Sequence, residues 1–382
     1  MDPTEFVCPE AGKVIRLPEG YTAFVPTPPS GIDYDPELVL LLSRADAAVS
    51  ELSGLGRFLP NPHLLIAPYV RREAVLSSRI EGTRASLSDL LLDEMSAGAA
   101  QGDEADVREV RNYVTALEYG IKRLKNLPLS LRLVRELHGK LMAGVRGNSA
   151  TPGAFRRSQN WIGPTGSTPS TATYVPPPPA QMGDALAHWE KSLHRRDEYP
   201  DLVQCALMHE QFEAIHPFLD GNGRVGRLLI TLFLIERKRL TQPLLYLSAY
   251  IEAHREEYYR LLQRCRTHCD WPAWLRFFLL GVTETATDAI DRAGNLMTLR
   301  ETWRRRLVGK PNALTLLDAL FVNPYVTAAG AQKILDVSNP TARQVIAVLT
   351  KAGMLKEATG RKWGQLYVAQ PILKVIDKPF AR

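Results

Sequence analysis

One glycine-rich stretch of this 382-residue chain gathers the residue types that a phosphate-handling site needs. The stretch runs from His216 to Arg227 and reads HPFLDGNGRVGR. Gly221 and Gly223 can adopt positive φ and let the backbone approach a ligand closely, so that consecutive N–H groups form a concave anion site. A helix is predicted to begin near Val225, and its N-terminus would point at the same place.

The polar side chains of this stretch supply the remaining roles. Arg224 and Arg227 lie three residues apart, so they share a helix face from which both can reach phosphate oxygens. Asp220 offers the carboxylate that Mg²⁺ prefers beside phosphates, and Asn222 adds a side-chain donor. His216 titrates near neutrality and can accept the proton of a hydroxyl nucleophile. A plain turn with solvated arginines is the alternative, but the combination of roles favours a phosphoryl-type transfer site.

The elements that must position these residues are mainly helices. Helical spacing of apolar residues predicts helices at about residues 35–49, 68–84, 105–124, 130–144, 180–194, 202–215, 225–237, 251–268 and 270–300. Residues 1–34 are rich in turn formers and are expected to be irregular. The segment 147–179 has no helical period, and its two β-prone pieces, 160–162 and 172–175, predict one hairpin.

The composition, 45% hydrophobic and 23% charged residues, is typical of a soluble globular protein. No signal peptide is recognised, and the longest apolar runs are too short to cross a bilayer, so we expect a cytoplasmic protein without membrane contact. The net charge of +6 suits a phosphate-bearing ligand or some nucleic acid without requiring either. Four cysteines predict no disulfide framework, and Cys265 and Cys269 around His268 lack a second cluster of metal ligands.

The stretch from His216 to Arg227 resembles the signature of the Fic family, HPFx(D/E)GNGRxxR, at every specified position. The resemblance implies a Fic helical core, with ATP as the co-substrate and attack at its α-phosphate. It implies these roles: His216 as general base, Asp220 as Mg²⁺ ligand, Gly221, Asn222 and Gly223 on the α-phosphate, Arg224 on the β-phosphate, Arg227 on the γ-phosphate, and Gly226 in the same ATP-binding set. Relatives that act as kinases carry a lysine in place of the second loop glycine, so Gly223 and Arg227 favour AMP transfer.

A second motif lies more than a hundred residues earlier, from Ser77 to Gly82, with the sequence SSRIEG. Taken alone it is a common helix end. Beside the Fic loop it resembles the family's inhibitory pattern, (S/T)xxxE(G/N), on the helix predicted at about 68–84. The resemblance implies that Glu81 pairs with Arg227 and removes the clamp on the γ-phosphate. In some relatives the same glutamate positions a water that removes AMP, so a hydrolytic role for Glu81 stays open.

Two further groups are expected around the loop. The hairpin at about 160–179 falls where the family has a flap that holds the target by strand addition, and its candidate residues are Trp161, Ile162, Tyr174 and Val175. Adenine needs an aromatic or apolar wall, and Tyr246, Tyr250, Tyr258 and Tyr259 are the candidates. Of these we favour Tyr258 and Tyr250, although aromatic residues on helices more often belong to the core.

The residues after about Pro311 resemble a winged helix-turn-helix. Helices are predicted at about 314–320, 327–335 and 341–352, followed by β-prone pieces at 355–358 and 366–369. The recognition helix would present Asn339, Thr341, Arg343 and Gln344, and the wing Arg361 and Lys362. This fold can bind DNA, but it can equally serve docking or dimerisation.

The sequence thus predicts three parts: an N-terminal helical region (1–104) with the inhibitory helix, a Fic core (105–305) and a winged-helix domain (306–382). The predicted function is a Mg²⁺- and ATP-dependent protein adenylyltransferase that modifies an unidentified target protein and itself, is autoinhibited, and forms a homodimer. One alternative is a DNA-binding regulator whose Fic core only senses a nucleotide. The other is a Fic enzyme that uses another nucleotide donor or mainly removes AMP.

Overall fold

The computed structural model describes residues 1–58, 63–96, 104–145, 151–360 and 364–380. The fold is mainly helical, as predicted, with two small antiparallel sheets among these residues. The helices before the C-terminal unit are α1 (Pro36–Phe58), α2 (His63–Ile80), α3 (Leu87–Ser96), α4 (Glu104–Arg123), α5 (Leu131–Leu141), α6 (Pro179–Leu193), α7 (Asp201–Ile215), α8 (Asn222–Glu236), α9 (Ser248–Ala253), α10 (Arg255–His268) and α11 (Trp271–Arg306).

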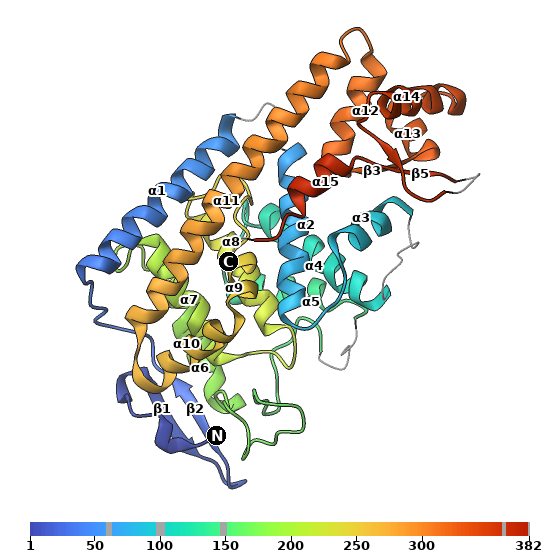
Figure 1. Cartoon of the computed structure of the whole chain (residues 1–382). Helices are drawn as coiled ribbons and strands as arrows, with labels where there is room; N and C mark the ends of the chain where they lie inside the picture. The colour runs from blue at the N-terminus through green and yellow to red at the C-terminus, as the bar shows by residue number, and fades with distance from the viewer. Residues whose placement is uncertain (59–62, 97–103, 146–150, 361–363, 381–382) are drawn as a thin grey trace.

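Helix α7 lies at the centre of the main core. All its residues after Asp201 are buried, because α6, α8, α10 and α11 pack around it. The long helices α1 and α11 run side by side along one flank of the molecule (Figure 1). Helix α8 follows α7 and packs against it, so the loop between these two buried helices has a fixed position.

The N-terminal residues are more regular than predicted. Strands β1 (Gly12–Arg16) and β2 (Thr22–Pro26) form an antiparallel hairpin, which lies at the opposite end of the molecule from the C-terminal unit (Figure 1). Phe24 N donates a hydrogen bond to Val175 O at 2.9 Å, so this hairpin supports the segment in which we predicted the flap. The expectation of an irregular segment over residues 1–34 is therefore wrong for β1 and β2.

The predicted flap is less regular than a hairpin of two strands. Its β structure is a single antiparallel bridge between Ile162 and Tyr174. Ile162 N donates to Tyr174 O at 2.8 Å, and Tyr174 N donates to Ile162 O at 3.0 Å. The rest of the described segment consists of turns and bends, because prolines and glycines interrupt the chain around the bridge.

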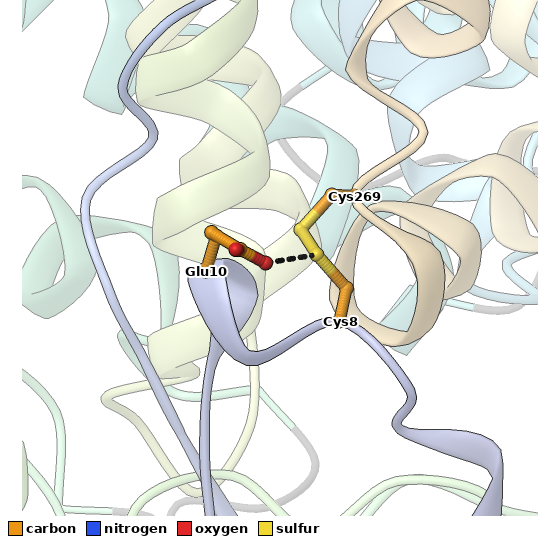
Figure 2. A group of neighbouring side chains, drawn as sticks. All are labelled: Cys8, Glu10 and Cys269. Atoms are coloured by element: carbon orange, nitrogen blue, oxygen red, sulfur yellow. Dashed lines mark hydrogen bonds between the residues drawn. A yellow bond between two sulfur atoms is a disulfide. The ribbon is translucent and has the colours of Figure 1, made fainter.

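A disulfide joins Cys8 to Cys269, which is the residue that ends α10 (Figure 2). The two cysteines are 261 positions apart, which is why no spacing in the sequence indicated their pairing. Glu10 places Oε2 at 3.0 Å from Cys8 Sγ. The sulfurs are bonded to each other, so they are not free metal ligands, and Cys265 is a separate buried thiol.

The C-terminal unit comprises α12 (Pro311–Val322), β3 (Tyr325–Thr327), α13 (Ala328–Leu335), α14 (Asn339–Lys351), β4 (Lys356–Glu357), β5 (Leu366–Val368) and α15 (Gln370–Ile376). The three strands form an antiparallel sheet in the order β3-β5-β4. This is the element order of a winged helix, whose assignment stays a prediction. Arg361 and Lys362, expected on the wing, lie outside the described residues. Helix α12 packs against α2, so the unit lies beside the N-terminal helices (Figure 1).

Several helices begin or end at residues other than those predicted from the sequence. Helix α2 begins at His63 rather than near Pro68, which lies inside it, and it ends at Ile80 rather than near Arg84. Helix α8 begins at Asn222, three residues before the predicted start. Helices α3 and α15 and strand β3 were not predicted, because their apolar patterns are short. None of the described helices is both long and apolar enough to cross a membrane.

Candidate active site

The loop between α7 and α8 turns through left-handed backbone at both ends. His216 ends α7 with φ +48°, and Gly221 precedes α8 with φ +79°. The side chain of Asn222 closes the loop on itself, since its Oδ1 accepts from Phe218 N and its Nδ2 donates to Phe218 O, both at 2.8 Å. Asn222 therefore holds the loop, a role that the sequence did not indicate, and its contact with a phosphate stays a prediction.

His138 of α5 supports this loop from below and was not identified from the sequence. Its ring stacks on Phe218 with centroids 3.7 Å apart. Its Nε2 lies 3.1 Å from Asp220 O, and its Nδ1 accepts a hydrogen bond from Gly153 N at 2.9 Å. Burial lowers the pKa of His138 to about 4. A neutral ring with the proton on Nε2 satisfies both contacts, so His138 holds the loop in position and does not need to be charged.

Arg156 and Asn160 hold the loop from the flap side, and the sequence indicated neither. Arg156 is buried and donates from Nε to His216 O at 2.9 Å and from Nη2 to Pro177 O at 2.5 Å. Asn160 donates from Nδ2 to Phe218 O at 2.7 Å. The carbonyl oxygens of His216 and Phe218 thus have fixed donors, which holds the loop in place.

His216 is mostly buried, with 19% of its side chain exposed, and it lines a cavity beside the loop. Burial, followed by the charges of Arg266 and Arg156, lowers the pKa of His216 to about 4. Its Nδ1 lies 3.3 Å from Glu213 O, which accepts the Nδ1 proton. The ring is therefore neutral at physiological pH, and Nε2 is left with a lone pair that can accept a proton.

Arg227 and Glu81 are in contact. Arg227 donates from Nη2 to Glu81 Oε1 at 2.7 Å, from Nε to Ser77 Oγ at 2.9 Å and from Nη2 to Ser77 O at 2.9 Å. Burial alone would raise the pKa of Glu81, but the charge and hydrogen bond of Arg227 hold it below its usual value. The arginine is buried, and the segment that contains Ser77 and Glu81 accepts three hydrogen bonds from its guanidinium.

The approach of Glu81 depends on two glycines. Gly82 has φ +99° and turns the chain directly after α2, which carries Glu81 toward α8. A Cβ on Gly223 would overlap Glu81 Oε1, so only glycine leaves room for the carboxylate there. The carboxylate therefore lies against the first turn of α8, where a helix N-terminus favours negative charge.

Helix α2 is anchored by a buried carboxyl that the sequence did not single out. Glu73 accepts hydrogen bonds from Tyr113 OH at 3.0 Å, Ser248 Oγ at 2.5 Å and Ser248 N at 3.2 Å. Tyr113 belongs to α4 and Ser248 to α9, so Glu73 ties α2 to two neighbouring helices. Burial raises the pKa of Glu73. The position of Glu81 is thus set by contacts two turns earlier in the same helix.

Arg224 and Asp220 lie on the other side of the loop. Arg224 donates from Nη1 to Glu109 Oε2 at 2.9 Å, and its Nη2 lies 3.6 Å from Asp220 Oδ1. Asp220 is half exposed, and its Oδ1 accepts from Gly221 N at 2.5 Å. Its Oδ2 has no hydrogen bond from the described part of the chain, so one carboxylate oxygen remains available to a cation.

A cavity of about 510 Å³ opens above the loop. Its lining includes Glu81, Glu213, His216, Gly223, Arg227, Tyr258 and Tyr259, with Trp161, Ile162 and Tyr174 from the predicted flap. Three residues predicted for this site lie elsewhere. Tyr250 packs against His254 and Phe277, Val175 is fully buried beneath the N-terminal hairpin, and Gly226 lets α8 approach α7 closely. Tyr258 lines the cavity but bonds its OH to His209 Nε2 at 2.9 Å.

These features define a helical protein with a glycine-rich loop at the start of a buried helix and a neutral histidine beside it. Residues 39–122 match the family described as Fic/DOC family N-terminal, and residues 128–234 match the Fic/DOC family. The chain belongs to the Fic family.

Relatives with curated names agree with this assignment. The chain is 30% identical over 163 residues to the protein adenylyltransferase Fic of Drosophila virilis, covering 41% of this chain and 31% of that protein. It is 26% identical over 298 residues to a probable protein adenylyltransferase of Aquifex aeolicus, covering 75% of this chain and 81% of that protein. The chain spans about a third of the length of the insect relatives that it matches.

Solved structures share the fold. A Fic family protein from Desulfovibrio desulfuricans G20 aligns with a TM-score of 0.57 at 20% identity, over 90% of this chain and 98% of that one. Residues 134–508 of Fic-1 from C. elegans align with a TM-score of 0.53 at 18% identity, over 68% of this chain and 73% of that one. At these identities the likeness concerns the fold alone.

Proposed function

We propose that this protein is a protein adenylyltransferase that moves AMP from ATP to a hydroxyl group of a target protein and of itself. The observation that carries the proposal is the shared cavity of His216, Gly223 and Arg227, which combines a neutral base, a backbone anion site and a cation. The names of the curated relatives support the choice of adenylyl transfer.

The reaction follows from the position of these groups. His216 Nε2 takes the proton of the target hydroxyl, and the hydroxyl oxygen forms a bond with the α-phosphorus of ATP. The bond from that phosphorus to the bridging oxygen of the β-phosphate breaks, and pyrophosphate leaves. Backbone N–H groups at the start of α8 and the guanidinium of Arg224 stabilise the charge on the phosphate oxygens.

The residues of the loop fit both ATP and Mg²⁺. Glu81 lies at the α8 N-terminus as a negatively charged group, so that position already accommodates an anion. Asp220, half exposed and with a free carboxylate oxygen, would hold Mg²⁺ together with phosphate oxygens. The cation would neutralise phosphate charge. Tyr258 and Tyr259 are two of the aromatic residues that line the cavity, and they are suited to the adenine.

The conformation described is the inhibited one in this proposal. Arg227 is occupied by Glu81 and Ser77, so it cannot clamp the γ-phosphate. An ATP molecule that binds beside this pair lacks the contact that orients its α-phosphate toward the nucleophile. Separation of Glu81 from Arg227 is then the activating step.

Other parts of the proposal concern partners and organisation. We propose a homodimer in the cytoplasm, the three parts predicted above, and the flap residues Trp161, Ile162 and Tyr174 as the docking region for the target. DNA binding through Asn339, Thr341, Arg343 and Gln344 is a proposal that rests on the element order of the C-terminal unit.

The function is tested by incubating wild type, Glu81→Gly and Glu81→Gly/His216→Ala with ATP labelled at the α-phosphate. We expect strong self-labelling of Glu81→Gly, weak labelling of wild type and none of the double variant. Parallel reactions with ATP labelled at the γ-phosphate and with other α-labelled nucleotides distinguish kinase activity and other donors. Labelling that persists without His216 would contradict the mechanism, and no labelling with any nucleotide would favour a nucleotide sensor.

A further inference from the structure

Glu213 is a buried carboxyl group beside the base, and nothing above gives it a role. It lies one turn before His216 on α7 with 6% of its surface exposed. It lines the same cavity as His216 and Arg227. Its Oε1 is buried and has no hydrogen-bond partner in the described part of the chain. A buried carboxyl without a partner is costly, so its retention points to a function.

Glu213 touches His216 in two ways. Its backbone carbonyl oxygen lies 3.3 Å from His216 Nδ1, and its carboxylate Oε2 lies 3.9 Å from the same nitrogen. The carbonyl keeps the proton on Nδ1, so the lone pair is on Nε2. The carboxyl group lies where positive charge appears on the ring once Nε2 accepts a proton. This is the arrangement by which a carboxylate orients a histidine base and stabilises its imidazolium.

We infer that Glu213 is a positioning residue for His216, and that its carboxylate stabilises the imidazolium formed when His216 takes the proton of the target hydroxyl. The inference rests on the proposed function. The proton moves from the hydroxyl oxygen to Nε2, the Nδ1 proton stays in place, and Glu213 exchanges no proton in the step. Its contribution is therefore electrostatic and depends on its being ionised.

The neighbours of Glu213 make its ionisation sensitive to pH. The groups that face it come from α7 and its C-terminal end, from α8, from α10 and from the turn after α2: His209, Glu210, His216, Arg227, Tyr258, Arg266 and Glu81. Arg266 is paired with Glu210 at 3.1 Å, and Arg227 is paired with Glu81, so both cations are partly neutralised. Burial, opposed by Arg227, raises the pKa of Glu213 to about 7.

Room for this carboxyl comes from the facing helix. A Cβ on Gly226 would lie 2.5 Å from Glu213 Oε1, so a larger residue there would displace it. Gly226 is the position predicted above to bind ATP. The structure instead uses it to let a carboxyl group lie between α7 and α8 beside the base.

The kinetic test uses the active Glu81→Gly protein with and without Glu213→Gln, over about pH 5.5 to 8.5. We expect the rate of the parent to rise with pH as Glu213 ionises, and the Gln variant to lack this rise. The two rates should coincide near the acid end and differ about tenfold or more near the alkaline end, with an unchanged KM for ATP. Equal rates at all pH values, or a constant ratio between them, would overturn the inference.

A second measurement does not depend on transferase activity. In protein with ¹⁵N-labelled histidine, the His216 signals, assigned by their loss in His216→Ala, should report the proton on Nδ1 and an inflection near pH 7. Glu213→Gln should remove that inflection, and Glu136→Gln should not, because Arg123 lowers the pKa of Glu136 to about 2. An inflection that survives Glu213→Gln contradicts the inference. If Glu81→Gly incorporates no label but the spectra behave as expected, the proposed function fails and the coupling of the two residues stands.

Discussion

Glu81 Oε1 lies 2.7 Å from Arg227 Nη2, although the two residues are 146 positions apart in the chain. The contact joins the turn after α2 to the first turns of α8, directly beside the glycines of the anion site. A carboxylate thus occupies part of the place at which a phosphate would bind. The same arginine can serve either the carboxylate or a phosphate, but not both at full strength.

The affinity for nucleotides should show whether Glu81 and a phosphate compete for Arg227. Glu81→Gly frees Arg227 for the γ-phosphate, so its affinity for ATP is expected to rise about tenfold, a typical gain for one charge-assisted contact. AMP has no γ-phosphate and should bind wild type and variant alike. Isothermal titration with both nucleotides measures the difference. An equal gain for AMP would show that the substitution opens the cavity generally and does not release a clamp.

Ser77 should contribute a smaller share of the inhibition. Ser77→Ala removes the acceptor for Arg227 Nε but leaves Glu81 and the Ser77 carbonyl in place. We expect self-labelling above that of wild type and below that of Glu81→Gly. Ser78→Ala is a matched control, because Ser78 is equally buried and its Oγ has no hydrogen-bond partner among the described residues. Equal labelling of the Ser77 and Ser78 variants would remove Ser77 from the inhibitory contact.

If Glu73 anchors α2, the loss of one of its hydrogen bonds should lower the free energy of unfolding. Tyr113→Phe deletes the hydrogen bond to Glu73 Oε1 and is expected to lower the free energy of unfolding by about 1 kcal/mol, measured by chemical denaturation. Tyr119→Phe loses a hydrogen bond to Glu136 at the surface and should cost less. A loss no larger for Tyr113→Phe than for Tyr119→Phe would contradict the anchoring role of Glu73.

Buried neutral histidines should make the fold sensitive to acid. The pKa of His138 is lowered to about 4 and that of His209 to about 3, both by burial. Below the ordinary histidine pKa of about 6.5, these histidines are protonated in the unfolded chain but stay neutral in the folded protein. The free energy of unfolding therefore decreases as the pH falls. Each histidine contributes roughly 2 kcal/mol of this loss by pH 5.

Glu213 acts in the opposite direction, because its raised pKa favours the folded state as pH falls toward 5. The comparison of wild type with His138→Gln therefore isolates one histidine. We expect the variant to lose less stability between pH 7 and pH 5 than wild type does, by chemical denaturation. Identical losses would mean that His138 is protonated in the folded protein.

The disulfide gives a further prediction. Cys8→Ser should lower the thermal unfolding temperature of the oxidised protein, because the bond restricts a very long loop in the unfolded chain, an effect typically worth about 2–4 kcal/mol. A reductant should lower the wild type to the level of the variant and leave the variant unchanged. A reductant effect on Cys8→Ser itself would indicate a different disulfide, formed by Cys269 after the loss of Cys8.

The sequence predicted the helical fold and the active-site loop because both depend on local patterns. Helix α7 and the loop after it were recognised from apolar spacing and from a long motif of specific residue types. His138 and Glu73 were missed because each is a single polar residue within an amphipathic helix, where a buried and an exposed polar residue look alike. Their roles arise from partners on other helices, which no spacing in the chain reveals.

Some contacts of the predicted residues could not be foreseen from the sequence. Asn222 was predicted as a phosphate ligand, and the structure adds its two hydrogen bonds to the backbone of Phe218. Tyr250 and Tyr258 come from neighbouring helices, and only Tyr258 lines the cavity. Residues 1–34 contain a hairpin that a few alternating residues between prolines did not indicate.

The helix that carries the inhibitory segment belongs to two parts of the molecule at once. Ser77 contacts Arg227 near the cavity, whereas Arg72 donates a hydrogen bond to Ile376 O, and α12 packs against the same helix. Proteolytic removal of the chain after α11 would therefore remove both of these contacts from α2. Under the proposed function, such a cut produces an enzyme that is more active, because the inhibitory helix is held less firmly. The same enzyme has a shorter half-life, because it is less stable.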